Sequence, residues 1–343
     1  METRFLGASG LEVSVLSFGA MTFSEGTGMF GLVGQTQGGD ARRQVDICLD
    51  AGVTLFDTAD MYSEGKSEEI LGAALGDRRK DIILATKGFA AMGPGAHDRG
   101  LSRRHLIEAC EDSLRRLKTD WIDLYQVHNF DARVPLEETL RALDDLVTAG
   151  KIRYVGCSNY AGWQLMKAAA IADKRGYSPY VSQQIQYSLM VRDAEEELLP
   201  CGVDQGVGSL IWSPLAQGYL SGKFRGGSSG TTRLEASGGL KLFAGETGEA
   251  VLAAMDAIVE ARGTVSHSQV ALNWVLKRPG VTTILVGART DEQLNDNLAA
   301  AQWSLTDEEV AALDKASQRP VPAYPNSSHR RYTDRNPQLF PRY

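Results

Sequence analysis

The chain has 343 residues, of which 43% are hydrophobic and 23% are charged, a composition typical of globular proteins rather than of disordered or fibrous ones. Its formal net charge of −7 repels phosphate backbones, so we expect no nucleic-acid partner. The sequence contains no apolar run of about 18 residues, and Glu2 and Arg4 interrupt the segment where a secretory signal has its apolar core. We therefore expect no membrane anchor and a cytoplasmic location.

The cysteines and histidines predict no metal site. The five histidines show no H-E-x-x-H spacing, and no C-x-x-C pair occurs among the four cysteines, Cys48, Cys110, Cys157 and Cys201. We expect neither a disulfide framework nor a bound metal, and we interpret the cysteines as small core residues. A redox role for them is the alternative.

The hydrophobic period alternates along the chain between short strand-like runs and longer helical patterns. Residues 4–13, with a Gly-Ala-Ser-Gly turn, predict a β-hairpin before the first of these runs. The eight predicted strands are, in order, 13–20, 54–58, 82–86, 122–127, 152–157, 181–186, 209–212 and 282–286. The helices predicted after them are, in order, 41–51, 66–75, 102–117, 135–149, 161–175, 194–199, 249–261 with 266–276, and 291–302, followed by 307–317.

This order of elements is typical of an α/β fold, a closed (β/α)8 TIM barrel in which a single domain uses the whole length, 1–343. The hairpin is expected at the bottom of the barrel, with extra helices near the C-terminus. Residues 221–248, rich in Gly and Ser, are long enough for a mobile lid, and a disordered linker is the other interpretation. Residues 319–343 show no periodicity and predict an irregular C-terminal tail.

Ionisable side chains follow three neighbouring strands of this barrel, at the ends where barrel enzymes carry their chemistry. Asp57 ends the second strand, and Tyr62 follows five residues later. Lys87 ends the third strand and His128 the fourth. A buried lysine is costly without a partner, so we expect Asp57 and Lys87 to pair. In a purely structural interpretation this is only an ion pair, His128 is a core histidine and Tyr62 is an amphipathic surface residue.

Together these four groups predict a general-acid site. The phenol of Tyr62 has an ordinary pKa of about 10, and a neighbouring ammonium favours the phenolate and lowers that value. Lys87 would supply the ammonium and Asp57 would hold it. His128 would donate a hydrogen bond to the same oxygen or to a substrate carbonyl. The set suits protonation of an oxygen on which negative charge develops.

The residues around these positions resemble a known family. The segments LFDTADMYSEGKSEEILGAAL, IILATKG and IDLYQVH are similar to those that carry the catalytic tetrad of the aldo-keto reductases, and the resemblance covers nearly the whole chain in order. It implies that Tyr62 is the proton donor and that Lys87 lowers its pKa. It also implies that Asp57 holds Lys87, that His128 orients the carbonyl, and that NADP(H) binds in an extended form on the barrel rim.

The same resemblance implies which side chains bind the cofactor. The expected positions are Ser158, Asn159 and Gln184 at the carboxamide, Trp212 stacked on the nicotinamide ring, Ser213, Leu215 and Gln217 at the pyrophosphate, and Gly287, Arg289, Gln293 and Asn297 at the adenosine.

The adenosine end departs from the pattern of many family members. Where those have Lys-Ser and an Arg four residues before the Asn, this chain has Gly287-Ala288 and Gln293. Arg289 is the expected clamp for the 2′-phosphate of NADPH. As a solvated cation at a helix start, it would instead leave only a weak preference over NADH. This variant, with the segment GAMT after the first strand, is more similar to bacterial reductases related to potassium-channel β subunits than to the animal aldose reductases.

Residues and resemblance together predict reversible, NADPH-dependent reduction of an aldehyde or ketone to an alcohol. Phe23, Phe89 and Phe130 follow strand ends and predict an apolar pocket for an uncharged carbonyl substrate, although packing roles fit them equally well. Two alternatives stay open. One is a cofactor-binding, redox-sensing regulatory subunit with little turnover, and the other is a barrel isomerase that uses the ion pair without nicotinamide.

Overall fold

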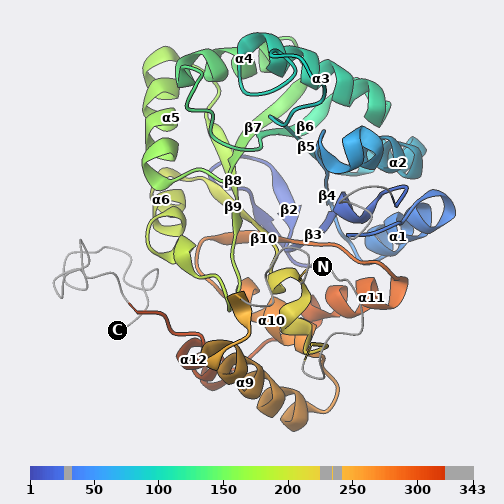
Figure 1. The fold of residues 1–343 in the computed structure, drawn as a ribbon, viewed down its shortest axis with the longest axis vertical. Helices are drawn as coiled ribbons and strands as arrows, with labels where there is room; N and C mark the ends of the chain where they lie inside the picture. The colour runs from blue at the N-terminus through green and yellow to red at the C-terminus, as the bar shows by residue number, and fades with distance from the viewer. Residues whose placement is uncertain (27–32, 225–233, 235–241, 321–343) are drawn as a thin grey trace.

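The computed structural model describes residues 1–26, 33–224, 234 and 242–320. Eight parallel strands close into a barrel, and helices surround it (Figure 1). In chain order the barrel strands are β3 (Leu16–Gly19), β4 (Leu55–Asp57), β5 (Ile83–Gly88), β6 (Ile122–Val127), β7 (Ile152–Ser158), β8 (Tyr180–Gln186), β9 (Gly208–Trp212) and β10 (Val281–Val286), and β10 pairs with β3 to close the ring. The predicted (β/α)8 fold is confirmed.

The outer layer consists of amphipathic helices that follow the strands. They include α1 (Gly38–Asp50), α2 (Lys66–Leu75), α3 (Arg103–Leu117), α4 (Leu136–Thr148), α5 (Gly162–Arg175), α6 (Leu198–Gln205), α9 (Glu246–Arg262), α10 (His267–Leu276), α11 (Asp291–Ala299) and α12 (Asp307–Ala316). Side chains fix several starts: Ser102 caps α3, and Thr306 with Glu309 forms a capping box on α12. The extra C-terminal helices are confirmed.

The N-terminal hairpin closes the bottom of the barrel. Its strands β1 (Thr3–Phe5) and β2 (Glu12–Ser14) are antiparallel, and Leu6 and Val13 are fully buried. Gly7 has a positive φ of 61°, and a Cβ there would lie 2.2 Å from the backbone oxygen of Gly206. The hairpin therefore approaches the barrel too closely for any side chain at this position. The side chains of Leu6 and Val13 pack against Leu55, Ala85, Leu124, Leu210 and Leu285.

Polar residues occupy the next layer of the barrel interior. Successive side chains of a strand point to opposite faces, so residues two apart share a face. Two residues beyond the apolar layer, β4, β5 and β6 carry Asp57, Lys87 and Gln126, and all three are buried. The apolar floor thus keeps water from reaching these side chains from below.

Two predicted elements differ most from the structure. The expected first strand, 13–20, is divided, because its start belongs to the hairpin strand β2 and its end to β3. A helix is expected over 194–199, but Asp193–Glu195 form a 3-10 turn and α6 begins at Leu198. In that turn the buried guanidinium of Arg192 lies 2.8 Å from a carboxylate oxygen of Glu195. This contact stabilises the turn, so the helix starts later.

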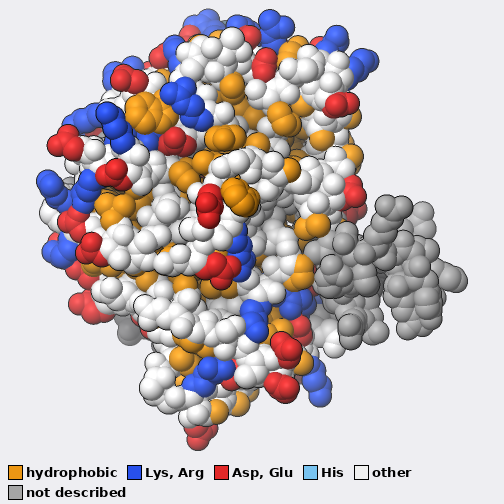
Figure 2. Space-filling model, turned by 180° about the vertical axis from the view of Figure 1, so that it is seen from behind, with side chains coloured by type: hydrophobic (Ala, Val, Ile, Leu, Met, Phe, Trp, Pro, Cys, Tyr) orange, Lys and Arg blue, Asp and Glu red, His pale blue; other side chains and the backbone are white. Residues whose placement is uncertain are grey.

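The predicted lid, 221–248, and the predicted tail, 319–343, fall largely on residues outside the described part of the chain and remain predictions. No helix among the described residues is long and apolar enough to cross a membrane. On the described part of the face shown in Figure 2, acidic and basic side chains are interspersed, and no patch of one sign dominates it.

Candidate active site

A crevice of about 540 Å³ opens at the carboxyl ends of the barrel strands. It brings together most of the side chains that the sequence predicts for catalysis and cofactor binding. Those that line it are Asp57, Tyr62, His128, Ser158, Asn159, Gln184, Trp212, Ser213, Leu215, Gln217, Gly287, Arg289, Gln293 and Asn297.

Lys87 lies fully buried beneath the crevice, where its ammonium joins Asp57 to Tyr62. The Nζ atom lies 2.5 Å from Oδ1 of Asp57, 2.7 Å from the backbone oxygen of Thr58 and 3.3 Å from the Tyr62 hydroxyl. Burial acts to lower the pKa of this ammonium, but Asp57 and Tyr62 outweigh burial and raise it. The phenol therefore has a charged amine beside it at neutral pH.

The carboxylate of Asp57 is held by side chains from three other strands. Its Oδ1 accepts from Lys87, and its Oδ2 accepts from the amide groups of Gln126 at 3.2 Å and Gln184 at 2.9 Å. Burial raises the pKa of this carboxyl, while Lys87 and the two amides oppose that rise. The sequence analysis did not single out Gln126, which stands in mid-strand. Gln126 follows Leu124 by two residues on the same strand, so both side chains face the barrel interior. This alternation is the sequence signal that could have identified Gln126.

His128 faces Tyr62 edge-on, with ring centroids 5.8 Å apart and planes at 79°. Burial and the nearby charge of Lys87 lower the pKa of His128 to about 3, so the imidazole is neutral at neutral pH. A neutral imidazole carries one N–H donor. His128 can therefore donate a hydrogen bond to a carbonyl oxygen beside Tyr62, but it is a poor source of a proton there.

Tyr62 begins a tight 3-10 turn, η3 (Tyr62–Gly65), between β4 and α2. The three residues after it have positive φ angles: 50° at Ser63, 57° at Glu64 and 89° at Gly65. Such a conformation costs a non-glycine residue about 1–2 kcal/mol, and strain of this kind clusters at functional sites. A Cβ on Gly65 would also lie 2.7 Å from a side-chain carbon of Arg116. The turn thus keeps Tyr62 out of α2 and close to Lys87.

The last residue of β7 and the loop after it carry two of the side chains predicted for the carboxamide of the cofactor. The hydroxyl of Ser158 donates to the backbone oxygen of Gln184 at 2.9 Å. The amide of Asn159 donates to the backbone oxygen of His128 at 3.0 Å, and Asn159 has a φ of 57°. These bonds connect the loop to the strand ends on both sides of it.

The loop after β9 carries the residues predicted for the nicotinamide ring and the pyrophosphate. The indole nitrogen of Trp212 is buried and has no hydrogen-bond partner among the described residues. Ser213 and Gln217 have φ angles of 54° and 58°, and the Ser213 hydroxyl accepts from the backbone N–H of Gln217 at 3.1 Å. Backbone strain is therefore concentrated along the wall of the crevice.

The part of the crevice predicted to hold the adenosine is organised around Arg289. Its Nε donates to the backbone oxygen of Val33 at 2.9 Å, and its backbone N–H donates to the side-chain oxygen of Gln293 at 3.0 Å. The amide of Asn297 lies 3.4 Å from the backbone oxygen of Gly287. Arg289 is thus tied both to the segment before α1 and to the start of α11.

The crevice also contains residues that were not predicted for the site, among them Met21, Lys223, Ser268 and Asp296. Lys223 is the most informative of them. Burial and the nearby Arg289 lower its pKa, so two cations converge on one end of the crevice. Lys223 falls inside the segment interpreted as a lid. Its position directly after Gly222, which ends the 3-10 turn after β9, is the local sequence signal that could have placed it beside the crevice.

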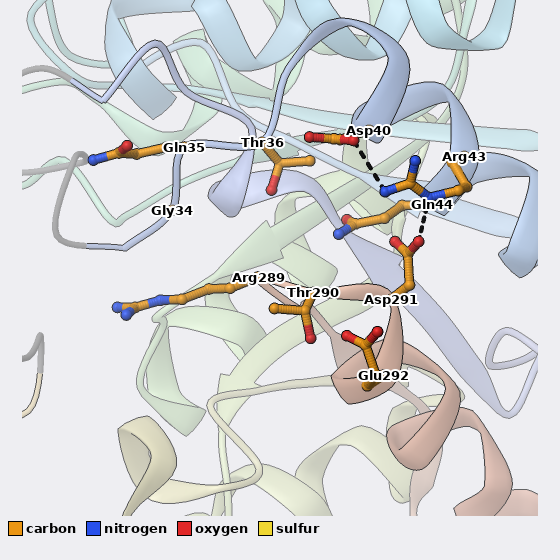
Figure 3. A pocket seen from close by; sticks show the side chains of 10 residues that line it. All are labelled: Gly34, Gln35, Thr36, Asp40, Arg43, Gln44, Arg289, Thr290, Asp291 and Glu292. Atoms are coloured by element: carbon orange, nitrogen blue, oxygen red, sulfur yellow. Dashed lines mark hydrogen bonds and ion pairs between the residues drawn. The ribbon is translucent and has the colours of Figure 1, made fainter.

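A second cavity of about 460 Å³ adjoins the crevice, and Arg289 lines both. Figure 3 shows Arg43 of α1 bridging Asp40 and Asp291 within this cavity. Because carboxylates already neutralise Arg43, this cavity offers less positive charge than the crevice does. It lies between α1 and the start of α11, which the Arg43–Asp291 ion pair joins.

The aromatic residues predicted for the substrate pocket lie elsewhere. Phe23 is fully buried, and its ring centroid lies 5.3 Å from that of Phe18, so it is a core residue rather than part of the pocket wall. Phe89 and Phe130 are half-buried but do not line the crevice. Phe130 instead packs edge-on against Tyr160 at 5.3 Å. Neighbouring residues after the same strands, such as Met21 and His128, do line the crevice, so spacing alone does not reveal which side chains face it.

The remaining reactive groups offer no second centre in the described part of the chain. No three His, Cys, Asp or Glu residues there stand close enough to hold a metal ion. Cys48, Cys110 and Cys157 are buried thiols, and Cys201 is partly buried. Burial raises the pKa of Cys110 to about 12, which keeps this thiol protonated and unreactive.

Comparison with known proteins gives the class that this fold and site define. The model of the Aldo/keto reductase family matches residues 15–318, so the chain belongs to the aldo/keto reductases.

Three relatives align along most of their length. YrpG, an uncharacterised oxidoreductase of Bacillus subtilis, is 39% identical, with 92% of this chain and 95% of that protein covered. A probable voltage-gated potassium channel subunit beta of Arabidopsis thaliana is 36% identical, with 88% and 91% covered. The versiconal hemiacetal acetate reductase of Aspergillus parasiticus is 32% identical, with 92% and 96% covered. Family membership supports an oxidoreductase that acts on carbonyl groups.

Proposed function

We propose that this protein reduces an uncharged aldehyde or ketone to an alcohol, with NADPH as reductant and Tyr62 as proton donor. The observation that carries the proposal is the position of the Lys87 ammonium, 2.5 Å from Asp57 and 3.3 Å from the Tyr62 hydroxyl, at the base of the crevice. An ammonium at this distance favours the phenolate over the phenol, so Tyr62 gives up its proton more readily than a free tyrosine.

Each side chain then has a separate role. Tyr62 delivers its proton to the carbonyl oxygen, and Lys87 stabilises the phenolate that remains. His128, which is neutral, donates a hydrogen bond to the same oxygen and fixes its position. Asp57 holds Lys87 in place, and in the reverse direction the phenolate takes the proton of an alcohol. The reduced nicotinamide supplies the hydride when it is bound.

The crevice has the features that a dinucleotide phosphate requires. Trp212, whose indole N–H is buried, lines the same crevice as Tyr62, and the nicotinamide would lie against it. Asn159 and Gln184 would hold the carboxamide. Lys223 and Arg289 both line the crevice, and burial and the nearby Arg289 lower the pKa of Lys223. A phosphate between them would relieve the repulsion between these two cations, which supports NADPH over NADH.

The decisive variant is Tyr62→Phe, which removes the acid and keeps the ring. We expect turnover to fall by about 10²- to 10⁴-fold, the usual contribution of a general acid, while the affinity for NADPH stays unchanged. Turnover is measured by NADPH absorbance across a panel of aldehydes and ketones, and affinity by fluorescence titration. A variant that retains wild-type turnover would exclude Tyr62 as the acid.

The similarity to the probable channel subunit of Arabidopsis favours a second candidate, a redox-sensing regulatory subunit. Such a protein would bind NADPH and exchange it slowly, with negligible steady-state turnover on every carbonyl of the panel. Measured cofactor exchange and turnover therefore separate the two. In both cases we place the protein in the cytoplasm, where its thiols would stay reduced.

A further inference from the structure

A second layer of polar side chains lies buried on the outer side of the barrel, behind the Tyr62 turn. On β5, Lys87 shares its face with the interior residue Ala85, so Thr86 points outward, toward the helices. There the Thr86 hydroxyl donates to Glu68 of α2 at 2.6 Å. Glu68 also accepts from the guanidinium of Arg116 of α3 at 2.6 Å. The charge of Glu68 is thereby matched by a cation.

A second carboxyl in this layer, that of Asp60, has a different environment. Asp60 is 0% exposed. One carboxyl oxygen accepts from the backbone N–H of Met61 at 2.6 Å, and the other has no hydrogen-bond partner among the described residues. The backbone N–H of Asp60 donates to the backbone oxygen of Lys87 at 3.0 Å. Asp60 therefore connects the outer layer to the strand that carries Lys87.

The hydroxyl of Tyr125, on β6, is the other buried group of this layer without a hydrogen-bond partner in the described residues. A Cβ on Gly88 would lie 2.3 Å from this hydroxyl, so a glycine is needed at that point of β5. Burial, with contributions from Cys110, Asp60 and Glu68, raises the pKa of Tyr125 well above its ordinary value. The hydroxyl therefore stays neutral and adds no charge to the layer.

We propose that Asp60 is a positioning residue for Tyr62, and that its carboxyl holds the Tyr62 turn over Lys87 only while it is protonated. This inference rests on the proposed role of Tyr62 as proton donor. Only Met61 separates the two residues, and the turn that follows is already strained. An ionised Asp60 would seek water, and the adjoining backbone would have to move with it.

The charges around Asp60 favour the neutral acid near neutrality. Burial raises its pKa to about 7, and the carboxylate of Glu68 adds to that rise. Arg116 and the backbone N–H groups of Met61 and Phe89 act in the opposite direction. Arg116 already donates a hydrogen bond to Glu68, so its charge stabilises an ionised Asp60 only in part. The carboxyl of Asp60 would then gain or lose its proton near neutral pH.

The first test compares pH–rate profiles of the wild-type protein and Asp60→Asn, which cannot ionise. We expect wild-type kcat to fall through a step near pH 7, by about tenfold or more, since small misplacements of a reacting group have effects of this size. Asp60→Asn should lack the step, with kcat at pH 6 within about twofold of wild type. A step retained in Asp60→Asn would overturn the proposal, because another group would then be titrating.

The matched control is Asp123→Asn, at the opposite end of the barrel. Asp123 is a carboxylate that is mostly buried, and it accepts from the backbone N–H of Leu84 at 2.9 Å and pairs with Arg79 at 2.8 Å. Its loss should lower stability but leave the step near pH 7 in place. If Asp123→Asn abolishes the step as Asp60→Asn does, the effect reflects general loosening, and the proposal is wrong.

A second readout does not depend on turnover. In protein labelled with ¹³C at the tyrosine ring, the Tyr62 signal, assigned through Tyr62→Phe, should shift near pH 7 in wild type and stay constant there in Asp60→Asn. A wild-type Tyr62 signal without this shift overturns the positioning role, whichever variants fold. If no carbonyl is reduced but the shift occurs, the proposed function fails while the coupling of Asp60 to Tyr62 stands.

Discussion

Lys87 stays charged inside the barrel because each of its three N–H donors has an oxygen within reach: Asp57, the backbone of Thr58 and the Tyr62 hydroxyl. An isolated ammonium in such a place would lose its proton, since burial disfavours charge. The same contacts explain why the phenol is the reactive partner. It is the only one of these three oxygens that also faces the crevice with a proton to donate.

Under the proposed function, Arg289 sets the preference between the two nicotinamide dinucleotides. Replacing Arg289 by Ala should weaken NADPH binding about tenfold or more and leave NADH binding nearly unchanged, because a charge-assisted contact to the 2′-phosphate exists only for NADPH. Fluorescence titration with each cofactor measures both constants.

The control for Arg289 is Arg43→Ala, which removes an arginine from the adjoining cavity without touching the crevice. Both affinities should stay near wild type in this variant. An equal loss of NADPH and NADH affinity in Arg289→Ala would instead assign the phosphate contact to Lys223 or to another group.

At the scale of elements, the turn η3 is the most constrained part of the site. It ends at Gly65, where φ is 89° and the side chain of Arg116 occupies the space that a Cβ would need. Because α2 starts directly after it, any shift at Gly65 is transmitted to Tyr62 on one side and to Glu68 on the other. The turn thus couples the inner and outer polar layers.

Gly65→Ala should lower the free energy of unfolding by about 1–3 kcal/mol, through the left-handed backbone and the contact with Arg116, and should also lower kcat. Urea unfolding and steady-state assays measure the two effects.

Gly176→Ala is the matched control, because Gly176 has a φ of 67° but no atom within 4 Å of an added Cβ. It should cost only about 1 kcal/mol and leave kcat unchanged. Equal effects of the two variants on kcat would show that the turn does not position Tyr62.

The order of strands and helices was predictable because the period of the hydrophobic residues differs between strands and helices. Asp57, Lys87 and His128 could be predicted as site residues because each stands at the end of a predicted strand. Other site residues escaped for physical reasons. Gln126 shares the inward face of its strand with Leu124, but only the closed barrel reveals that its amide reaches Asp57. Phe23 follows a strand end, but the chain folds back there and buries the ring against Phe18. Contacts set by tertiary folding cannot be derived from spacing along one strand.

At the scale of the whole molecule, the barrel has two ends with different tasks. The hairpin fills one end with apolar side chains, and the crevice occupies the other. The ring between them is continuous, because β10 pairs with both β3 and β9. Stability and chemistry therefore depend on different residues of the same strands.

Leu6→Ala tests this separation. Leu6 is fully buried in the barrel floor, so the variant should lose about 2–5 kcal/mol of unfolding free energy, while kcat and KM change little at temperatures where it stays folded. Phe5→Ala is the control, because Phe5 is 63% exposed and its loss should cost far less. A large change of kcat in Leu6→Ala would show that the floor influences the catalytic end.

The carboxylate of Asp57 bonds to side chains of β5, β6 and β8, and the barrel closes only when β10 reaches β3. During synthesis on the ribosome, the lysine and carboxylate therefore emerge long before the residues that enclose them. The nascent polypeptide must keep these groups hydrated until its last strand has left the exit tunnel. Truncated translation products would accordingly lack the site altogether rather than carry a weakened form of it.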